Sequence, residues 1–255
     1  MTGSARRRSG DSRYGGLVPL VAAAVCPHPP LLVPEVAGAA APELDDLRAA
    51  CDTAVGRLFT SDPDAVVLLG AGPTTGPVRS TATGSLQPWG VDLDVPLLPG
   101  QPDRGAVLPL SLTVGAWLLA RQGVRAPVSA VQVAADAGPA EVGALAESVD
   151  AAGERVALLV LGDGSACRGQ KSPGYDDPRA EAYDRRVATA LAGADVDVLL
   201  GLDPVVSAEL KAAGRASWQV LAGAARSSGG DWRAELLHDA APYGVAYFVA
   251  SWERV

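Results

Sequence analysis

The feature that most constrains the fold is a run of six apolar residues, Val-Ala-Leu-Leu-Val-Leu, at 156–161. An apolar run of this length without alternation is typical of a strand buried on both faces. Leu17 to Val25 is a second such run, and Ala65 to Leu69 is a third. Segments rich in glycine or proline follow each run and end it. The sequence therefore predicts a sheet whose central strands are covered on both sides.

Segments with helical spacing lie between these runs. We expect helices at 43–59, 105–122, 138–152, 178–192, 203–213 and 216–225. We expect further strands at 127–134 and 244–252, a loop at 70–77, and short edge strands and turns at 79–104. Asp177 and Asp203 each precede a proline and are predicted N-caps, and Gly214 is expected to end the helix that Asp203 begins. Strands that alternate with helices predict one α/β domain at 17–255, with a mainly parallel central sheet and helices on both faces.

The charge distribution disfavours a nucleic-acid partner. The formal net charge is −8, although Arg6, Arg7, Arg8 and Arg13 all lie in the first sixteen residues. The rest of the chain is therefore more acidic than the whole, whereas phosphate backbones require clustered cations. Residues 1–16 lack apolar periodicity, so we expect a disordered basic tail.

No apolar run reaches the roughly 18 residues of a membrane span. The three cysteines, Cys26, Cys51 and Cys167, have no regular spacing and indicate reduced thiols rather than a disulfide framework. We therefore expect a cytoplasmic protein without a membrane segment.

The polar residues best suited to catalysis or ligand binding follow two of the predicted strands. His28 stands between two prolines directly after the first strand, and Asp163, Ser165 and Arg168 follow the run at 156–161. Ligand sites in open α/β sheets lie at the carboxyl ends of the strands. His28 is either a ligand or catalytic base, or a histidine bonded within a turn. Arg168 either pairs with Asp163 or binds an anionic substrate.

Three stretches of the chain resemble a known family. They are Val-Cys-Pro-His-Pro-Pro-Leu-Leu-Val-Pro-Glu at 25–35, the segment at 160–195, and Ala-Pro-Tyr-Gly-Val-Ala-Tyr at 241–247. The middle segment holds Gly-Asp-Gly-Ser-Ala-Cys-Arg, a Pro-Gly-Tyr-Asp loop with Tyr175, and the pair Tyr183-Asp184. Over 17–252 the chain resembles the class III extradiol dioxygenase subunit-B superfamily, which includes the Memo-like proteins.

The resemblance implies a site of two histidines and one glutamate around Fe(II), with a further histidine as base. His28 matches the first metal histidine. The second is expected at 72–75, where no histidine stands, and the base falls on Ala166 or Cys167. The last metal-site residue falls near 213–215, Ala-Gly-Arg. One of four expected positions is retained, so we expect a degenerate metal site.

Several functions remain open from the sequence. The first is an iron-free homologue that binds a small molecule or a protein partner in a pocket of His28, Asp163, Ser165, Arg168 and Tyr175. The second is an enzyme. It would be either a ring-cleaving dioxygenase or an altered site with His28 as general base beside Asp163, or Cys167 as nucleophile.

Further alternatives concern the metal and the partners. Zinc held by Cys26, His28 and Cys167 is a minor alternative to Fe(II). The chain could instead serve as an interaction subunit, and homo-oligomerisation is left open. His238, the only other histidine, is expected in a turn or on the surface.

Overall fold

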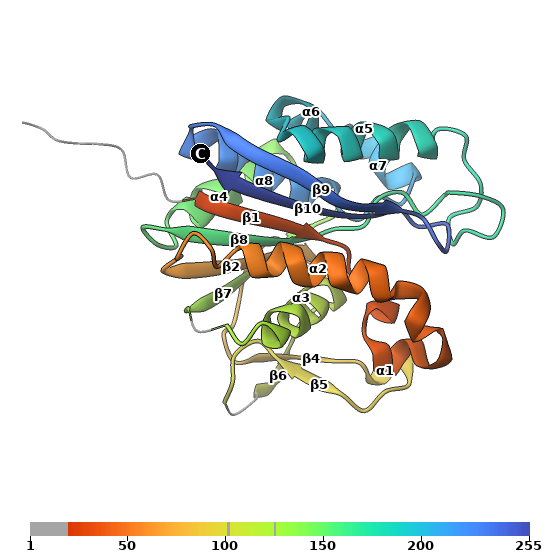
Figure 1. The fold of residues 1–255 in the computed structure, drawn as a ribbon, viewed down its shortest axis with the longest axis horizontal. Coiled ribbons are helices and arrows are strands. Elements are labelled where there is room, and N and C mark those ends of the chain that lie inside the picture. Colours follow the sequence, from red (N-terminus) through yellow and green to blue (C-terminus); the bar gives the residue numbers. More distant parts are fainter. Residues whose placement is uncertain (1–19, 101–102, 125) are drawn as a thin grey trace, which may run out of the picture.

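The computed structural model describes residues 20–100, 103–124 and 126–255, so the predicted basic tail lies outside the described residues. Its centre is a seven-stranded sheet in the order β3-β7-β2-β8-β1-β10-β9 (Figure 1). The strands are β1 (Leu20–Cys26), β2 (Ala65–Gly72), β3 (Gly76–Val78), β7 (Val128–Ala134), β8 (Val156–Leu161), β9 (Trp232–Ala240) and β10 (Tyr247–Arg254).

The sheet is mixed rather than mainly parallel, which corrects the sequence prediction. The four central strands, β7, β2, β8 and β1, pair in parallel. The three outer strands, β3, β10 and β9, pair antiparallel with their neighbours. β9 and β10 are joined by the short connection 241–246, and a connection of that length permits antiparallel pairing only.

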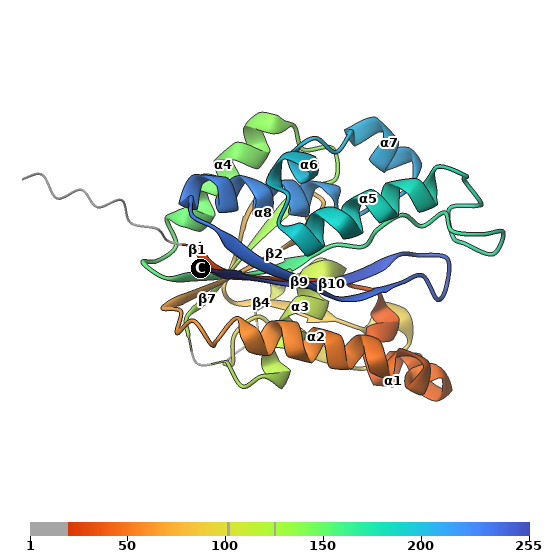
Figure 2. The ribbon, with the colours of Figure 1, turned by 45° about the horizontal axis from the view of Figure 1, so that its top comes forward.

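Helices cover both faces of the sheet (Figures 1 and 2). One face carries α4 (Pro139–Asp150), α5 (Ala180–Gly193), α6 (Val196–Leu200) and α8 (Arg215–Ser228), and the other carries α2 (Asp45–Arg57) and α3 (Leu110–Arg121). β1 is buried along its whole length. Its alternate residues enter different cores: Ala23 and Val25 pack under α8, whereas Ala24 and Cys26 pack under α2 and α3. The apolar run in β1 therefore corresponds to a strand with a hydrophobic core on each face.

The polar segment before α3 forms a small second sheet. It contains β4 (Ala82–Ser85), β5 (Asp94–Pro96) and β6 (Asp103–Val107) in the order β5-β4-β6. A Cβ atom at Gly84 would overlap the side chain of Thr113 in α3. Glycine at this position therefore lets β4 lie directly against the helix.

Some predicted boundaries are wrong. The helix expected from residue 105 begins only at Leu110, because Pro109 is extended, with φ −63° and ψ 160°. The loop expected at 70–77 holds the end of β2 and the first two residues of β3. β9 was not predicted, since its residues alternate between partly buried and exposed without a continuous apolar run.

Of the two predicted N-caps, one is confirmed and one is wrong. Asp203 begins α7 (Pro204–Glu209), and its carboxylate accepts the N–H groups of Val205 and Val206. That helix ends before Gly214, which instead precedes α8. Asp177 does not cap α5, because Arg179 is the preceding residue and Asp177 accepts its N–H at 2.9 Å. No helix within the described ranges is long and apolar enough to cross a membrane.

Candidate functional site

His28 and Asp163 meet at the carboxyl ends of two adjacent parallel strands. The register of β1 and β8 pairs Cys26 with Leu161, so the residues just beyond them are neighbours. Asp163 Oδ1 accepts the backbone N–H of His28 at 2.8 Å and lies 3.5 Å from His28 Nδ1. The His28 side chain is 10% exposed, and Nδ1 has no hydrogen-bond partner in the described part of the chain. The pair is therefore preorganised but leaves one polar atom of the imidazole unsatisfied.

The segment after His28 is tied to α2 by a buried arginine. It folds into three short helical turns, η1 (Pro30–Leu32), α1 (Pro34–Ala37) and η2 (Gly38–Leu44). Arg48 of α2 is buried and donates to the carbonyls of Leu32 and Ala41 and to the Asp45 carboxylate. One guanidinium thus fastens this segment to α2.

β10 and the turn before it add two tyrosines that the sequence did not mark as site residues. Tyr247 is buried, and its pKa is raised, first by burial and then by the nearby charge of Asp163. The hydroxyl of Tyr243 donates to Glu43 at 2.8 Å, which joins the β9–β10 turn to η2. Both tyrosines stand in the 241–247 segment, so the family resemblance was the one sequence signal for them.

Ser165 and Arg168 belong to a different cluster, centred on Asp184 of α5. Asp184 accepts the N–H of Ser165 at 2.8 Å and its hydroxyl at 2.6 Å, and Arg168 Nη1 lies 3.4 Å from the same carboxylate. Burial raises the pKa of Asp184, while the bonds from Ser165 and Arg168 oppose that rise. The carboxylate paired with Arg168 is therefore Asp184, and not Asp163, which was one of the two alternatives from the sequence.

The candidate residues thus fall into two groups. The Asp184 cluster lies under α5, in the layer that packs on one face of the sheet, whereas Tyr247, beside Asp163, belongs to the core of the other face. Hydrogen bonds join His28 to Asp163 and Ser165 to Asp184, and none joins the two groups in the described residues. Ser165 is fully buried, so it holds the loop after β8 in place instead of facing a ligand.

Cys167 has the environment of a structural thiol. It is buried, and its Sγ lies 3.4 Å from the carbonyl oxygens of Gly174 and Leu210. Burial and the charge of Asp177 raise its pKa, whereas a nucleophile needs a lowered one. Cys26 packs in the core on the opposite face. The zinc set of Cys26, His28 and Cys167 is therefore not assembled.

The remaining candidates lie apart from His28 and Asp163. Tyr175 is 79% exposed on the loop before α5, with a positive φ of 65°. His238 lies within β9 rather than in a turn, two strands from β1. Burial lowers its pKa, which the charges of Asp239 and Asp46 partly oppose.

The positions that the family resemblance assigns to further metal ligands fasten loops instead. Thr74 Oγ1 accepts from Gln132 at 2.7 Å, and Thr75 Oγ1 accepts the N–H of Ala134 at 3.2 Å. Arg215 is buried and donates to the carbonyls of Ala135 and Ala137. Within residues 20–100, 103–124 and 126–255, no three His, Cys, Asp or Glu side chains gather so that they could hold a metal ion. These residues do not fit a two-histidine, one-carboxylate iron centre.

Comparison of the sequence with protein-family models and with curated proteins gave no match. The structure is similar to the crystal structure of an uncharacterized protein, JW3007, from Escherichia coli K12. The TM-score is 0.51 and the identity is 12%, over 91% of this chain and 99% of that chain. At this identity the likeness concerns the fold alone.

Proposed function

We propose that this protein is an iron-free homologue of the class III extradiol dioxygenase subunit-B superfamily, and that it binds a small molecule beside His28 and Asp163. The small number of possible metal ligands is the observation that supports the iron-free part of this proposal. The chain has two histidines: His28 follows the end of β1, and His238 lies on β9, two strands away. Within the described residues, Asp163 is the one acidic side chain bonded to His28. Ferrous iron in this type of site requires two imidazoles and a carboxylate together.

The unsatisfied Nδ1 of His28 supports ligand binding at this place. A buried polar atom without a partner costs about 1–3 kcal/mol. Nδ1 is itself covered and lies 3.5 Å from Asp163, so a small shift of the imidazole would let a ligand hydrogen bond remove that cost. Asp163 fixes the backbone of His28, so a ligand would meet an imidazole already in position. Tyr247, whose pKa is raised in part by the charge of Asp163, would supply apolar surface near these polar groups.

Metal content tests the iron-free part of the proposal. Protein without a histidine tag is purified anaerobically, and its metals are measured by mass spectrometry in wild type, His28→Ala and the matched control His238→Ala. We expect substoichiometric metal in all three. A stoichiometric metal that disappears only in His28→Ala would overturn the proposal and restore a metal centre at the strand end.

Ligand binding is tested separately by a thermal-shift screen of small molecules. We expect at least one compound to stabilise wild type and His238→Ala but not His28→Ala. A compound that stabilises all three proteins equally binds elsewhere. If every hit behaves so, the proposed site is wrong even where the metal measurement agrees.

An acid–base enzyme is the second candidate, and the contact between His28 and Asp163 favours it. A carboxylate 3.5 Å from an imidazole nitrogen can orient the ring toward a substrate proton, as a general base requires. Catechols and small esters are the substrates to screen. Turnover that His28→Ala and Asp163→Asn abolish, and His238→Ala leaves intact, would establish this function. The buried Cys167 is not favoured as its nucleophile.

A further inference from the structure

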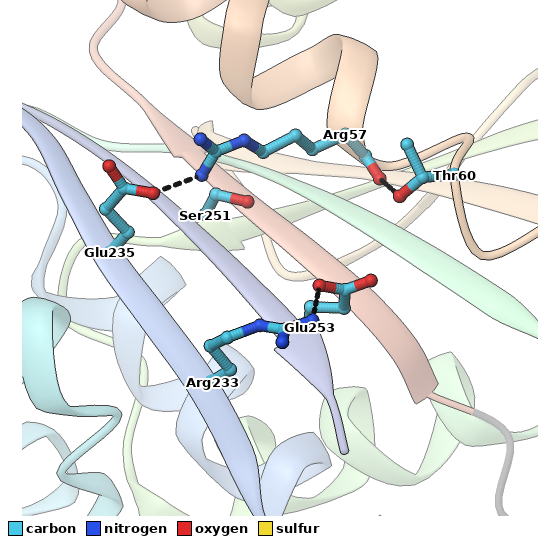
Figure 3. Close-up of a pocket in the computed structure, with 6 residues that line it drawn as sticks. All are labelled: Arg57, Thr60, Arg233, Glu235, Ser251 and Glu253. Carbon is cyan, nitrogen blue, oxygen red and sulfur yellow. Dashed lines mark hydrogen bonds and ion pairs between the residues drawn. The ribbon is translucent and has the colours of Figure 1, made fainter.

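A cavity of about 380 Å³ lies beside the C-terminal end of α2, over β9 and β10 (Figure 3). Its lining consists of Arg57, Thr60, Arg233, Glu235, Ser251 and Glu253. None of these residues belongs to the His28–Asp163 pair, which lies at the carboxyl end of β1. The volume falls within the range of about 300–1,000 Å³ that is usual for small-molecule sites.

The charges in this cavity are balanced in two separate pairs. Arg57 Nη1 lies 2.6 Å from Glu235 Oε2, and Arg233 pairs with Glu253. All four side chains are between 41% and 68% exposed. Each ion pair joins one guanidinium nitrogen to one carboxylate oxygen, so further donors and acceptors remain on both partners. The cavity can therefore bind an anionic and a cationic group at once.

Ser251 supplies a buried polar group at the wall of the same cavity. It is 5% exposed on β10, opposite Glu235 of β9, and Figure 3 shows it beside the Arg57–Glu235 pair. Its hydroxyl makes no hydrogen bond within the described residues, whereas the hydroxyl of Thr60 donates to the carbonyl of Arg57 at 2.8 Å. The residue is almost fully buried, but its hydroxyl remains accessible from the cavity, so it can hydrogen-bond a bound group.

We infer that this cavity binds a small zwitterion, an amino acid with free amino and carboxylate groups. Its carboxylate would lie between a guanidinium and the Ser251 hydroxyl, and its ammonium against a glutamate. A lone anion or cation would compete with one existing ion pair and leave one charge uncompensated. A zwitterion keeps the sum of charges at zero, so both pairs can persist.

The probes are the twenty free L-amino acids, with binding measured by calorimetry on the full chain. We expect at least one to bind. Its N-acetyl derivative, which lacks the ammonium, and its carboxamide, which lacks the carboxylate, should each bind at least about tenfold more weakly. The inference fails if no amino acid binds, or if either derivative binds as well as the parent.

Variants then locate the site. Ser251→Ala and Arg233→Gln should each weaken binding about fivefold to tenfold, since the first removes a hydroxyl donor and the second removes a positive charge from the cavity. Arg179→Gln is the matched control, because it breaks an exposed ion pair with Glu209 outside this cavity. His28→Ala should bind normally. Binding that both cavity variants leave unchanged, or that His28→Ala abolishes, places the ligand elsewhere and overturns the inference.

Discussion

The carboxylate of Asp184 holds Ser165 by two hydrogen bonds, from its backbone N–H at 2.8 Å and from its hydroxyl at 2.6 Å. Asp184 stands on α5, nineteen residues further along the chain, and it is almost fully buried. This relationship anchors the loop after β8 to the helical layer. It also explains why Ser165 and Arg168 turn away from His28, although all of these residues follow neighbouring strand ends.

Removing the Asp184 carboxylate should destabilise the fold. Asp184→Ala leaves the N–H and hydroxyl of Ser165 buried without acceptors, and we expect a loss of about 3 kcal/mol in the free energy of unfolding. Asp184→Asn keeps one acceptor oxygen and should lose less. Urea denaturation measures both variants. A loss below about 1 kcal/mol for Asp184→Ala would show that the loop is held by other contacts.

The raised pKa of Asp184 predicts a pH dependence of stability. The unfolded chain loses this proton near pH 3.9, while the folded chain retains it to higher pH. The contribution of the group is therefore present below that pH and falls as the pH rises through the folded pKa. Asp184→Asn lacks this fall, so its stability relative to wild type should improve as the pH rises.

Urea denaturation at a series of pH values from about 3 to 7 tests this expectation. The same substitution at the exposed Asp92, Asp92→Asn, is measured in parallel as a reference. A difference between Asp184→Asn and wild type that stays constant with pH, or that moves in the opposite direction, would contradict a raised pKa.

The thiols of the native protein should react slowly. Cys26, Cys51 and Cys167 are all buried. A hydrogen bond with Cys26, together with burial, raises the pKa of Cys51, and burial raises that of Cys167. A chromogenic disulfide reagent should therefore titrate no thiol rapidly in buffer and all three in denaturant. Rapid modification of one thiol, lost in Cys167→Ala, would instead revive a reactive role for Cys167.

Two glycines of different surroundings should respond to alanine in opposite ways. A Cβ at Gly162 would lie 2.6 Å from the Cα of Gly214 at the start of α8, so Gly162→Ala should cost about 1–3 kcal/mol. Gly143 lies inside α4 with open space around its Cα, so Gly143→Ala should stabilise by about 0.5–1 kcal/mol. Thermal unfolding compares the two, and equal effects would contradict the close contact between β8 and α8.

Local sequence signals determined the central strands and several helices. The run at 156–161 coincides with β8, because a strand buried on both faces needs apolar residues at every position. Asp203 followed by proline marked the start of α7, since capping depends on residues adjacent in the chain. Local signals did not predict β9. It is a half-buried edge strand, and the spacing of its apolar residues depends on which neighbouring elements cover it.

The sequence by itself also determined which residues were absent: two histidines in all, with none where the family resemblance expects the second ligand. Only the tertiary structure decided how the polar residues are grouped. Residues that follow one strand within a few positions point to different layers, so chain proximity between Asp163 and Ser165 says little about their partners. His28 is bonded to Asp163 because β1 pairs with β8, and Ser165 is bonded to Asp184 because α5 packs against the loop after β8. No local sequence pattern encodes these distances.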